Sequence, residues 1–318
     1  MRSKSTCGRP GTIGESQARG LAAPGPLSAR TTRHLTPYLL VAPPVLLLAA
    51  LVIYPLVYNV VLSLRNYRTG EFVGLHNFAR AFDDPLFFAS LRATGVYVSW
   101  ALTVEILLRL TLALLVHRTI RSGWARTLIY VLFFIPMVTP PVVAGVIARL
   151  MYSPNYGVIN VALAKLGLID TEILWLSEPG TAMFAVLSVD VWQWMPFVFL
   201  VCFAGLQSVP IDTVEAARVD GAGGWRLFRH VELPYLRSLL MLVVVFRFTD
   251  TFRVFDHVQV LTGGGPGAST EFLSLYLYRI AFKFFNLSYA AALSLFVLAV
   301  ASVAFAVLGR YLGKEVGE

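Results

Sequence analysis

Charged residues and cysteines are both scarce in this chain. Only 14% of its 318 residues are charged, whereas a soluble domain carries roughly 25%. The two cysteines, Cys7 near the N-terminus and Cys202 within an apolar run, suggest neither a disulfide framework nor a metal site. The low charge therefore points away from a soluble domain and toward a membrane.

Several catalytic signatures are also missing. The sequence has no G-x-x-x-x-G-K-[ST] phosphate loop, so we expect no ATP hydrolysis by this chain. The segment LTGGGPGAST at 261–270 is rich in glycine but lacks the lysine, and it is interpreted as a turn. No H-E-x-x-H, G-x-S-x-G or paired-Asp signature supports an enzyme.

Long apolar runs dominate what is present. The chain is 57% hydrophobic with a mean hydropathy of +0.70, and a membrane-spanning helix needs about 20 mostly apolar residues. Runs of that length predict an all-α membrane protein with six transmembrane helices, at about 38–62, 93–116, 127–149, 181–205, 238–260 and 287–309. Residues 1–36, rich in Gly, Pro, Ser and Arg, are predicted to be a disordered tail. Residues 37–312 form the transmembrane domain, and 313–318 form a short second tail.

The distribution of basic residues predicts the orientation. With six spans both termini share a side, and that side carries fifteen Lys and Arg against seven on the other. Cytoplasmic loops are enriched in Lys and Arg, so both termini and the loop 206–237 are expected in the cytoplasm. The loops 63–92 and 151–180 are then expected outside. This bias also explains the net charge of +8 without a nucleic-acid partner.

The loop 206–237 contains an ordered pattern, EAARVDGAGGWRLFRHVELPYL at 215–236. Pro210 ends the preceding span, and Asp212 with Glu215 has the spacing of a capping box. A short helix is predicted over Val214–Val219, ended by the glycines Gly221, Gly223 and Gly224.

A second short helix follows these glycines. Trp225, Phe228 and Val231 recur at three-residue spacing along one side of it, and Pro234 closes it. The module is either a packed connector or a docking surface. In the second case the small residues Ala216, Ala217, Gly221 and Ala222 allow close approach, and Trp225 and Phe228 fill a partner's pocket. A DNA-binding helix-turn-helix is disfavoured because four basic and four acidic residues leave no electropositive footprint.

Three segments carry a family resemblance. EAARVDGAGGWRLFRHVELP resembles the EAA loop of permease subunits in bacterial binding-protein-dependent ABC importers. The matching positions are Glu215, Ala216, Ala217, Asp220, Gly221, Ala222, Leu233 and Pro234, while Val231 stands where Ile is commoner. FDHVQVLTGGGPGAST at 255–270 resembles the maltose-type and glycerol-3-phosphate-type sugar branch, and the first span resembles that branch more weakly.

The resemblance implies a type I ABC importer permease fold and a set of partners. In such permeases the loop is a coupling helix, which sits in a groove of a separate ATPase subunit. Two ATPase subunits would carry ATP and Mg²⁺, so this chain itself needs no cofactor. A second related permease, an extracytoplasmic binding protein, a sugar substrate and membrane lipid are the other expected partners. The expected location is the bacterial inner membrane.

Charges inside the predicted spans suggest a pathway. Glu105 and Arg109 have the spacing of an ion pair on one helix, and Asp190 lies in the fourth span. Arg247, Asp250, Arg253 and Asp256 recur every third residue, so they wind around the fifth span and neighbouring members can neutralise each other.

Sugars need hydroxyl partners and aromatic faces. The candidate pathway residues are therefore Trp192, Gln193, Arg247, Asp250 and Phe252. Two other functions stay open at this point. One is an intramembrane enzyme that uses Asp190 or Asp250 as a catalytic acid. The other is a proton-coupled secondary transporter.

Overall fold

The computed structural model describes residues 27–120 and 122–313. Residues 1–26 and 314–318, which include most of the two predicted tails, lie outside the described residues. The prediction of disorder is wrong for 27–36, because the first helix begins at Leu27. Extending an existing helix costs far less free energy than nucleating one, so the apolar run carries the helix back into this polar stretch.

Regular structure in the described residues is helical apart from one isolated β-bridge between Arg65 and Phe72. The elements are α1 (Leu27–Ser63), α2 (His76–Phe82), α3 (Pro85–Thr119), α4 (Gly123–Val138), α5 (Pro141–Met151), α6 (Val158–Lys165), α7 (Pro179–Gln207), α8 (Ile211–Val219), α9 (Gly224–Leu227), η1 (Phe228–Glu232), α10 (Leu233–Phe252), α11 (Asp256–Leu261), α12 (Leu273–Tyr278), η2 (Arg279–Lys283) and α13 (Leu287–Gly313). The all-α class is confirmed.

The chain divides into two compact units, residues 1–57 and 58–318. In the first unit the described residues form most of α1. Its apolar side chains, among them Leu46, Leu47 and Leu51, are exposed. An apolar helix surface of this kind is stable only against lipid or other apolar groups, because exposing it to water is unfavourable.

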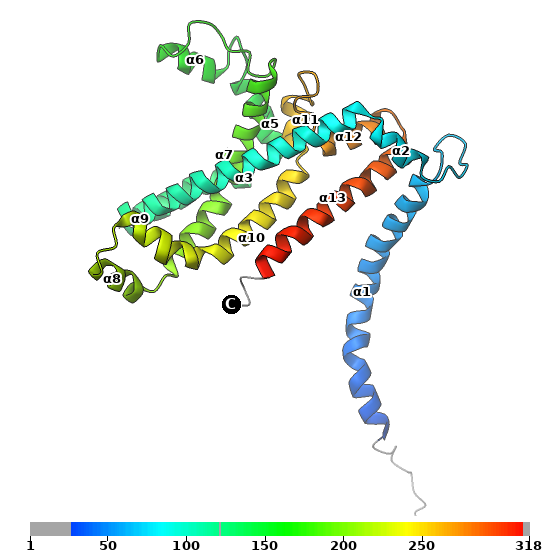
Figure 1. The fold of residues 1–318 in the computed structure, drawn as a ribbon, viewed down its shortest axis with the longest axis horizontal. Helices are drawn as coiled ribbons and strands as arrows, with labels where there is room; N and C mark the ends of the chain where they lie inside the picture. The colour runs from blue at the N-terminus through cyan, green and yellow to red at the C-terminus, as the bar shows by residue number, and fades with distance from the viewer. Residues whose placement is uncertain (1–26, 121, 314–318) are drawn as a thin grey trace, which may run out of the picture. The chain divides into compact units, whose positions relative to one another are not determined.

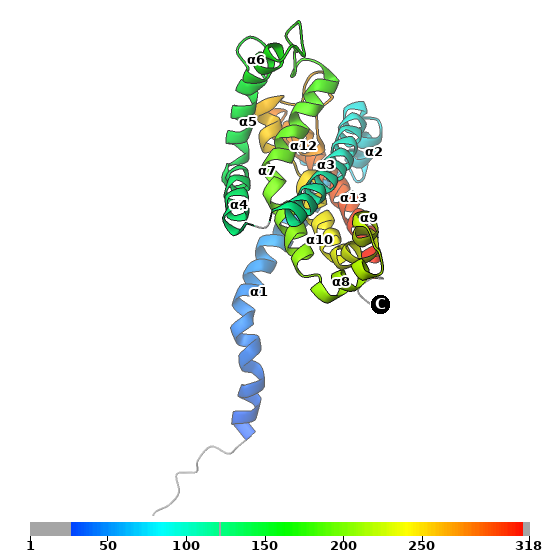
Figure 2. The ribbon, with the colours of Figure 1, turned by 90° about the vertical axis from the view of Figure 1, so that its left-hand side faces the viewer.

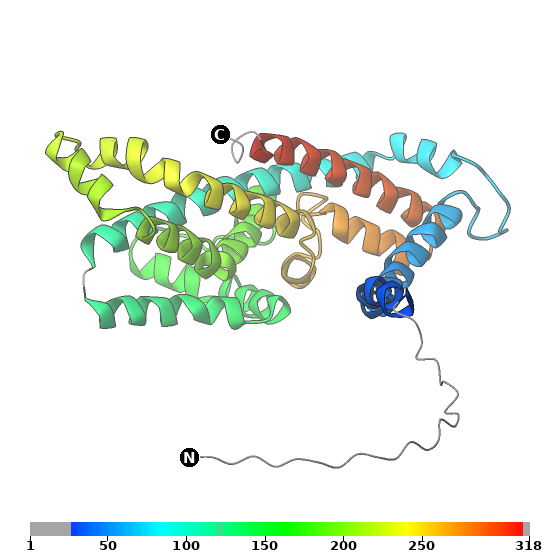
Figure 3. The same ribbon diagram turned by 90° about the horizontal axis from the view of Figure 1, so that it is seen from below.

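The second unit is built around four helices, α3, α7, α10 and α13. Helix α3 packs along α7, α10 packs against both, and α13 packs against α10, α12 and α2. Figures 1 and 3 show α8 and α9 together at one end of this bundle, with α2 and α12 toward the other end. Apolar side chains fill the bundle between α7 and α10, for example Phe199, Cys202 and Leu236.

Within the described residues, four helices are long and apolar enough to cross a membrane: Leu40–Ser63, Pro85–Thr119, Pro179–Gln207 and Leu287–Val307. They confirm a multi-pass membrane protein. The span predicted at 127–149 is not one continuous helix, because α4 and α5 meet at an angle of 97° (Figure 2). The break falls at Thr139 and Pro140, before Pro141. Prolines disfavour helical geometry in the residue before them and remove a backbone donor.

The predicted span 238–260 is likewise not confirmed as a continuous helix. Helix α10 ends at Phe252, and a turn separates it from α11, which begins at Asp256. Its 20 residues also include three charged ones, Arg237, Arg247 and Asp250. By length and composition, residues 27–120 and 122–313 contain four candidate spans, or five if the bent pair α4 and α5 counts as one span. The count of six is therefore not established.

The glycine-rich segment 261–270 forms a tight turn, as predicted. Gly263, Gly264 and Gly267 have positive φ angles of 59°, 93° and 60°, a region that only glycine adopts readily. At Gly264 a side chain would also collide with the carboxylate of Glu271. Glu271 itself forms an ion pair with Arg279 at 2.7 Å, which ties the end of this loop to η2.

Candidate functional site

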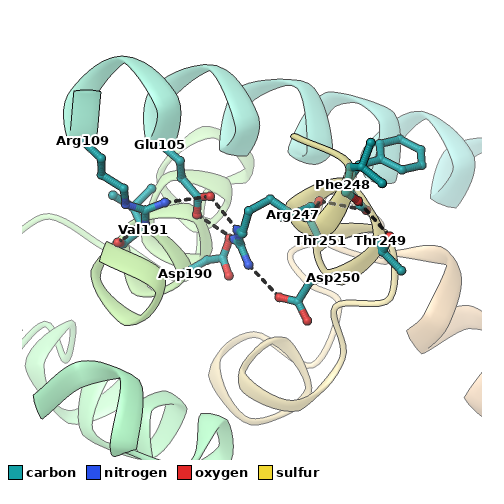
Figure 4. A network of polar contacts seen from close by, with 10 residues as sticks. Glu105, Arg109, Asp190, Val191, Arg247, Phe248, Thr249, Asp250 and Thr251 are labelled. Carbon is teal, nitrogen blue, oxygen red and sulfur yellow. Dashed lines mark hydrogen bonds and ion pairs between the residues drawn. The ribbon is translucent and has the colours of Figure 1, made fainter. Parts of the chain in front are cut away.

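Five charged residues meet inside the bundle and form what we call the charge network. Glu105 and Arg109 come from α3, Asp190 comes from α7, and Arg247 and Asp250 come from α10 (Figure 4). Four of these five residues are at most 2% exposed. Asp250 is the exception, with 29% of its side chain exposed. Three helices far apart in sequence are thus joined by charge.

Arg247 is the centre of the charge network. Its Nε and Nη2 donate to the two carboxylate oxygens of Glu105, both at 2.7 Å. Nη2 also donates to Asp190 at 2.7 Å, and Nη1 donates to Asp250 at 2.6 Å. The guanidinium group lies 4.6 Å from the ring centroid of Trp194. A planar guanidinium suits such bidentate contacts, whereas an ammonium group would satisfy fewer of them.

Arg109 completes the charge network on its other side. Its Nη1 lies 2.9 Å from Glu105 Oε2, one turn earlier on α3, so the predicted Glu105–Arg109 pair is confirmed. Its Nη2 donates to the carbonyl of Val191 at 2.6 Å. Charges this deeply buried are tolerated only when they are paired and hydrogen-bonded, and here every one of them is paired.

The expected Arg247–Asp250 contact is also present, as described above, but it is one part of a larger cluster. Arg253 and Asp256, the next members of the three-residue series, lie in and just after the turn that ends α10 and are exposed. The spacing predicted that all four residues wind around one helix. In the structure α10 ends at Phe252, so Arg247 and Asp250 lie on it and the other two do not.

A cavity of about 330 Å³ opens beside the charge network. Its walls come from α5, α7, the end of α10 and α11, and they combine acceptors, one cation and aromatic rings. The lining residues are Pro141, Asp190, Gln193, Trp194, Asp250, Arg253, Val254, Phe255, Asp256 and His257. Gln193 is fixed by donating to the carbonyl of Thr139 at 2.8 Å. Among the described side chains, His257 is notable because its Nε2 is buried without a hydrogen-bond partner.

The structure brings together only part of the predicted pathway set. Gln193 and Asp250 line the cavity, and Arg247 lies directly behind Asp250. Trp192 instead borders a separate apolar cavity of about 260 Å³ between α5 and α7. Phe252 packs against Phe248 with ring centroids 5.7 Å apart, as part of the core. Adjacent residues on a helix point about 100° apart, which explains why Trp192 and Gln193 diverge.

Eight of the ten lining residues lie outside the predicted pathway set, among them the aromatic residues Trp194 and Phe255 and the buried His257. Trp194 carried a usable signal, because it lies four residues after Asp190, on the same face of α7. His257 carried none, since its position depends on the break between α10 and α11. No group of three or more potential metal ligands gathers in the part of the chain that the structure describes.

The loop 206–237 is the second candidate site. It has the predicted helix–glycine–helix form: α8, then Gly221 with a φ of +78°, then α9. The helix α9 continues without interruption through η1 into α10, so Pro234 lies in the first turn of α10 rather than at a break.

The predicted capping box is wrong. Helix α8 begins at Ile211 after Pro210, and no side chain caps it. Asp212 and Glu215 are the second and fifth residues of α8, so neither stands at the N-cap position from which a side chain reaches the free N–H groups of the first turn.

Exposed apolar side chains distinguish this loop. No residue of α8 is buried, and Val219 is 88% exposed. Trp225 is 70% exposed, whereas Phe228 is buried in the bundle beside it. The predicted apolar stripe is therefore split, with Phe228 packing inward and Trp225 facing outward. The remaining predicted positions are exposed or half-buried: Glu215, Ala216, Ala217, Asp220, Gly221, Ala222, Leu233 and Pro234. Glu215 also borders a cavity of about 720 Å³ between the loop and α3.

Comparison with known proteins places these features in context. Residues 109–317 match the family model described as "Binding-protein-dependent transport system inner membrane component". The chain is 34% identical over 254 residues to the trehalose/maltose transport system permease protein MalF of Thermococcus litoralis, covering 79% of this chain and 83% of that protein. It is 33% identical to the sulfoquinovosyl glycerol transport system permease protein SmoG of Agrobacterium fabrum, covering 87% and 90%.

A solved structure shares the fold. The crystal structure of a bacterial ABC transporter involved in the import of the acidic polysaccharide alginate superimposes with a TM-score of 0.79 at 20% identity. The match covers 91% of this chain and 98% of that chain. The helical fold described above is thus shared with a chain of that transporter.

Proposed function

The chain belongs to the family of binding-protein-dependent transport system inner membrane components, and from that premise we propose that it is one permease subunit of an ATP-driven carbohydrate importer. Members of this family are transport subunits, so the chain is not an enzyme. The names of MalF and SmoG, and of the lactose transport system permease protein LacF of Rhizobium radiobacter, which is 32% identical over 286 residues, support carbohydrate as the substrate class.

The observation that carries the coupling role is the exposed surface of the 206–237 loop. Val219 and Trp225 are among its most exposed apolar side chains. They belong to the segment that connects α7 to α10 in the sequence. Exposed apolar groups on a charged loop are typical of a docking surface. The partner that suits it is a separate ATPase subunit, which holds ATP and Mg²⁺ and whose closure the loop passes to α7 and α10.

The full importer contains two copies of the ATPase, a second related permease and an external binding protein. We place the chain in the bacterial inner membrane with both termini and the 206–237 loop in the cytoplasm, because the basic residues favour that side. The loops 63–92 and 151–180 then face outward and contact the binding protein. A cysteine placed at Asn155 should react with an impermeant thiol reagent added from outside, and protection there would contradict this orientation.

The translocation path follows the cavity beside the charge network. Asp190, Gln193 and Asp250 present oxygen atoms to it, and Trp194 and Phe255 present rings. Oxygen acceptors and ring faces suit a sugar's hydroxyls and apolar faces. A proton relay or a catalytic acid would need a free carboxyl group, and both Asp190 and Asp250 are instead bound to Arg247.

Reconstitution of the whole complex tests this function. The importer, with its binding protein in the external solution and ATP inside the vesicles, should take up an oligosaccharide such as lactose or trehalose. Uptake should stop when vanadate blocks the ATPase or when this chain is omitted. Uptake that persists without ATP and follows an imposed proton gradient would support secondary transport and reject our proposal.

A further inference from the structure

One ion pair ties the 206–237 loop to a helix that the loop does not join by sequence. Arg118, in the last turn of α3, donates from Nη2 to Glu232 Oε2 at 2.7 Å. The same nitrogen donates to the carbonyl of Gly224 at 3.2 Å. Glu232 ends η1 and Gly224 begins α9, so a single guanidinium contacts both ends of the α9–η1 segment.

The pair is better defined than a surface contact. The side chain of Glu232 is only 6% exposed and that of Arg118 is 39% exposed. Exposed ion pairs contribute little, because solvent screens them. Losing the partner of a nearly buried carboxylate leaves it uncompensated, which is much more costly. Gly224 adds to the constraint, since a Cβ there would lie 3.2 Å from Arg118 Nη1.

The position of Arg118 on α3 gives the contact its meaning. The same helix carries Glu105 and Arg109, which belong to the charge network with Asp190 and Arg247. Arg118 lies thirteen residues after Glu105, which is about 20 Å along a helix that rises about 1.5 Å per residue. Helix α3 is therefore one continuous helix that contacts the loop through Arg118 near its C-terminus. Through Glu105 and Arg109, nearer its middle, it contacts α10 and α7.

We infer that Arg118 and Glu232 are positioning residues that couple motion of the 206–237 loop to α3. The inference rests on the proposed function, because it assumes that an ATPase moves this loop. The loop's covalent joins run only to α7 and α10, and α8 itself packs chiefly against α9 and η1. Without the pair, the loop would act on α3 mainly through apolar packing, such as the cluster that contains Phe228 of the loop and Val116 of α3. Apolar contacts are not directional, so α3 would follow a movement of the loop less closely than α10 does.

The pair predicts a particular failure, namely loss of coupling without loss of assembly. Arg118→Ala and Glu232→Gln should each let the complex purify with its ATPase at the wild-type ratio. Carbohydrate taken up per ATP hydrolysed, measured in reconstituted vesicles with the binding protein present, should fall about tenfold. The charge-reversed double variant Arg118→Glu with Glu232→Arg should recover at least half of the wild-type ratio, because it restores the pair.

Two comparisons make the result decisive. Arg310→Ala removes an exposed cation near the end of another spanning helix, α13, and should keep the wild-type uptake-to-hydrolysis ratio. A wild-type ratio in Arg118→Ala, or a double variant no better than the single ones, would overturn the inference. Loss of ATPase co-purification in Glu232→Gln, which keeps the side chain's shape, would do so as well. If the wild-type complex takes up no carbohydrate, the proposed function fails instead.

Discussion

The charge network and the 206–237 loop use charged residues in opposite ways. In the network, Arg247 binds three carboxylates within 2.7 Å, and its own side chain is buried. In the loop, charged residues such as Asp212, Glu215 and Arg229 are exposed, and so are apolar ones. The network is complete within this chain. The loop exposes apolar side chains, Val219 and Trp225 among them, that the described residues leave uncovered.

This contrast separates two kinds of mutational effect. A change in the charge network should act on the folding of the chain itself, because the lost partner is internal. A change in the exposed part of the loop should leave folding intact and act on association. The predictions below are arranged to test that division, from the largest expected effect to the smallest.

Arg247→Ala should be the most damaging single change. It removes the guanidinium from Glu105, Asp190 and Asp250 and leaves two of these carboxylates almost fully buried. Removing one partner of a buried ion pair costs about 3–5 kcal/mol, so the chain should fail to accumulate in the membrane. Asp250→Ala should be milder, because 29% of that side chain is exposed. Quantitative immunoblotting of membranes measures both, and equal accumulation of the two variants would show that Arg247 is not the centre.

Gly221→Asp should separate the loop from the network most clearly. The φ angle of +78° is strained for a side chain, at a cost of about 1–2 kcal/mol. Among the described residues, however, no atom beyond the two chain neighbours lies within 4 Å of a Cβ placed there. The variant should therefore insert normally but lose co-purification of the ATPase by more than tenfold, because charge and volume enter the docking surface.

Gly221→Ala is the matched control for that change. It carries at least as much backbone strain, because Asp adopts positive φ angles more readily than Ala. It adds little volume, so it should retain most of the ATPase. If both variants lose the ATPase equally, backbone strain and not a partner contact is the cause. If neither loses it, the docking role of this loop is wrong.

Much of this architecture follows from sequence because it depends on local chemistry. Apolar length alone located α3, α7 and α13, and Glu105 with Arg109 could be paired from their spacing on one helix. Gly221 predicted a reversal of the chain direction, since only glycine adopts its φ angle readily.

What could not be predicted depends on distant contacts. Arg247 binds Glu105, 142 residues away, and Asp190, 57 residues away. No spacing rule reveals such partners, so only its neighbour Asp250 was foreseen. The break between α10 and α11 has no proline to mark it, and it determines which residues line the cavity. The α4–α5 break differs, because Pro140 and Pro141 were a visible signal that apolar length concealed.

Trp225→Ala and Phe228→Ala form the sharpest matched pair within the loop. Their rings lie 5.5 Å apart, but Trp225 is 70% exposed and Phe228 only 9%. Trp225→Ala should leave thermal stability within about 0.5 kcal/mol and weaken ATPase binding, since exposed tryptophans that become buried are frequent hot spots, worth about 2 kcal/mol or more. Phe228→Ala should destabilise the chain by about 3 kcal/mol or more. Similar melting temperatures for the two purified variants would contradict the division.

The smallest expected effect concerns Asp84, an acid that is held by hydroxyl groups instead of a cation. It caps α3 through the N–H groups of Leu86 and Phe87, and it accepts hydrogen bonds from Tyr276 and Tyr289. Burial alone would raise its pKa, but these hydrogen bonds outweigh burial and hold the pKa below the ordinary value. The contribution of Asp84 to the free energy of unfolding is thus fully present above the ordinary pKa of about 3.9. It is lost as the pH falls through the lowered pKa of the folded state. Asp84→Asn keeps the capping oxygen but replaces the oxygen that accepts from Tyr276 and Tyr289 with an amide NH2 group. It should therefore lose about 1 kcal/mol at pH 7 and flatten the acid-side fall in melting temperature. If the melting temperature of that variant falls with acid as in the wild type, Asp84 does not control the fall. If the variant is much less stable than the wild type at pH 7, the charge, and not the cap, holds α3 to α12 and α13.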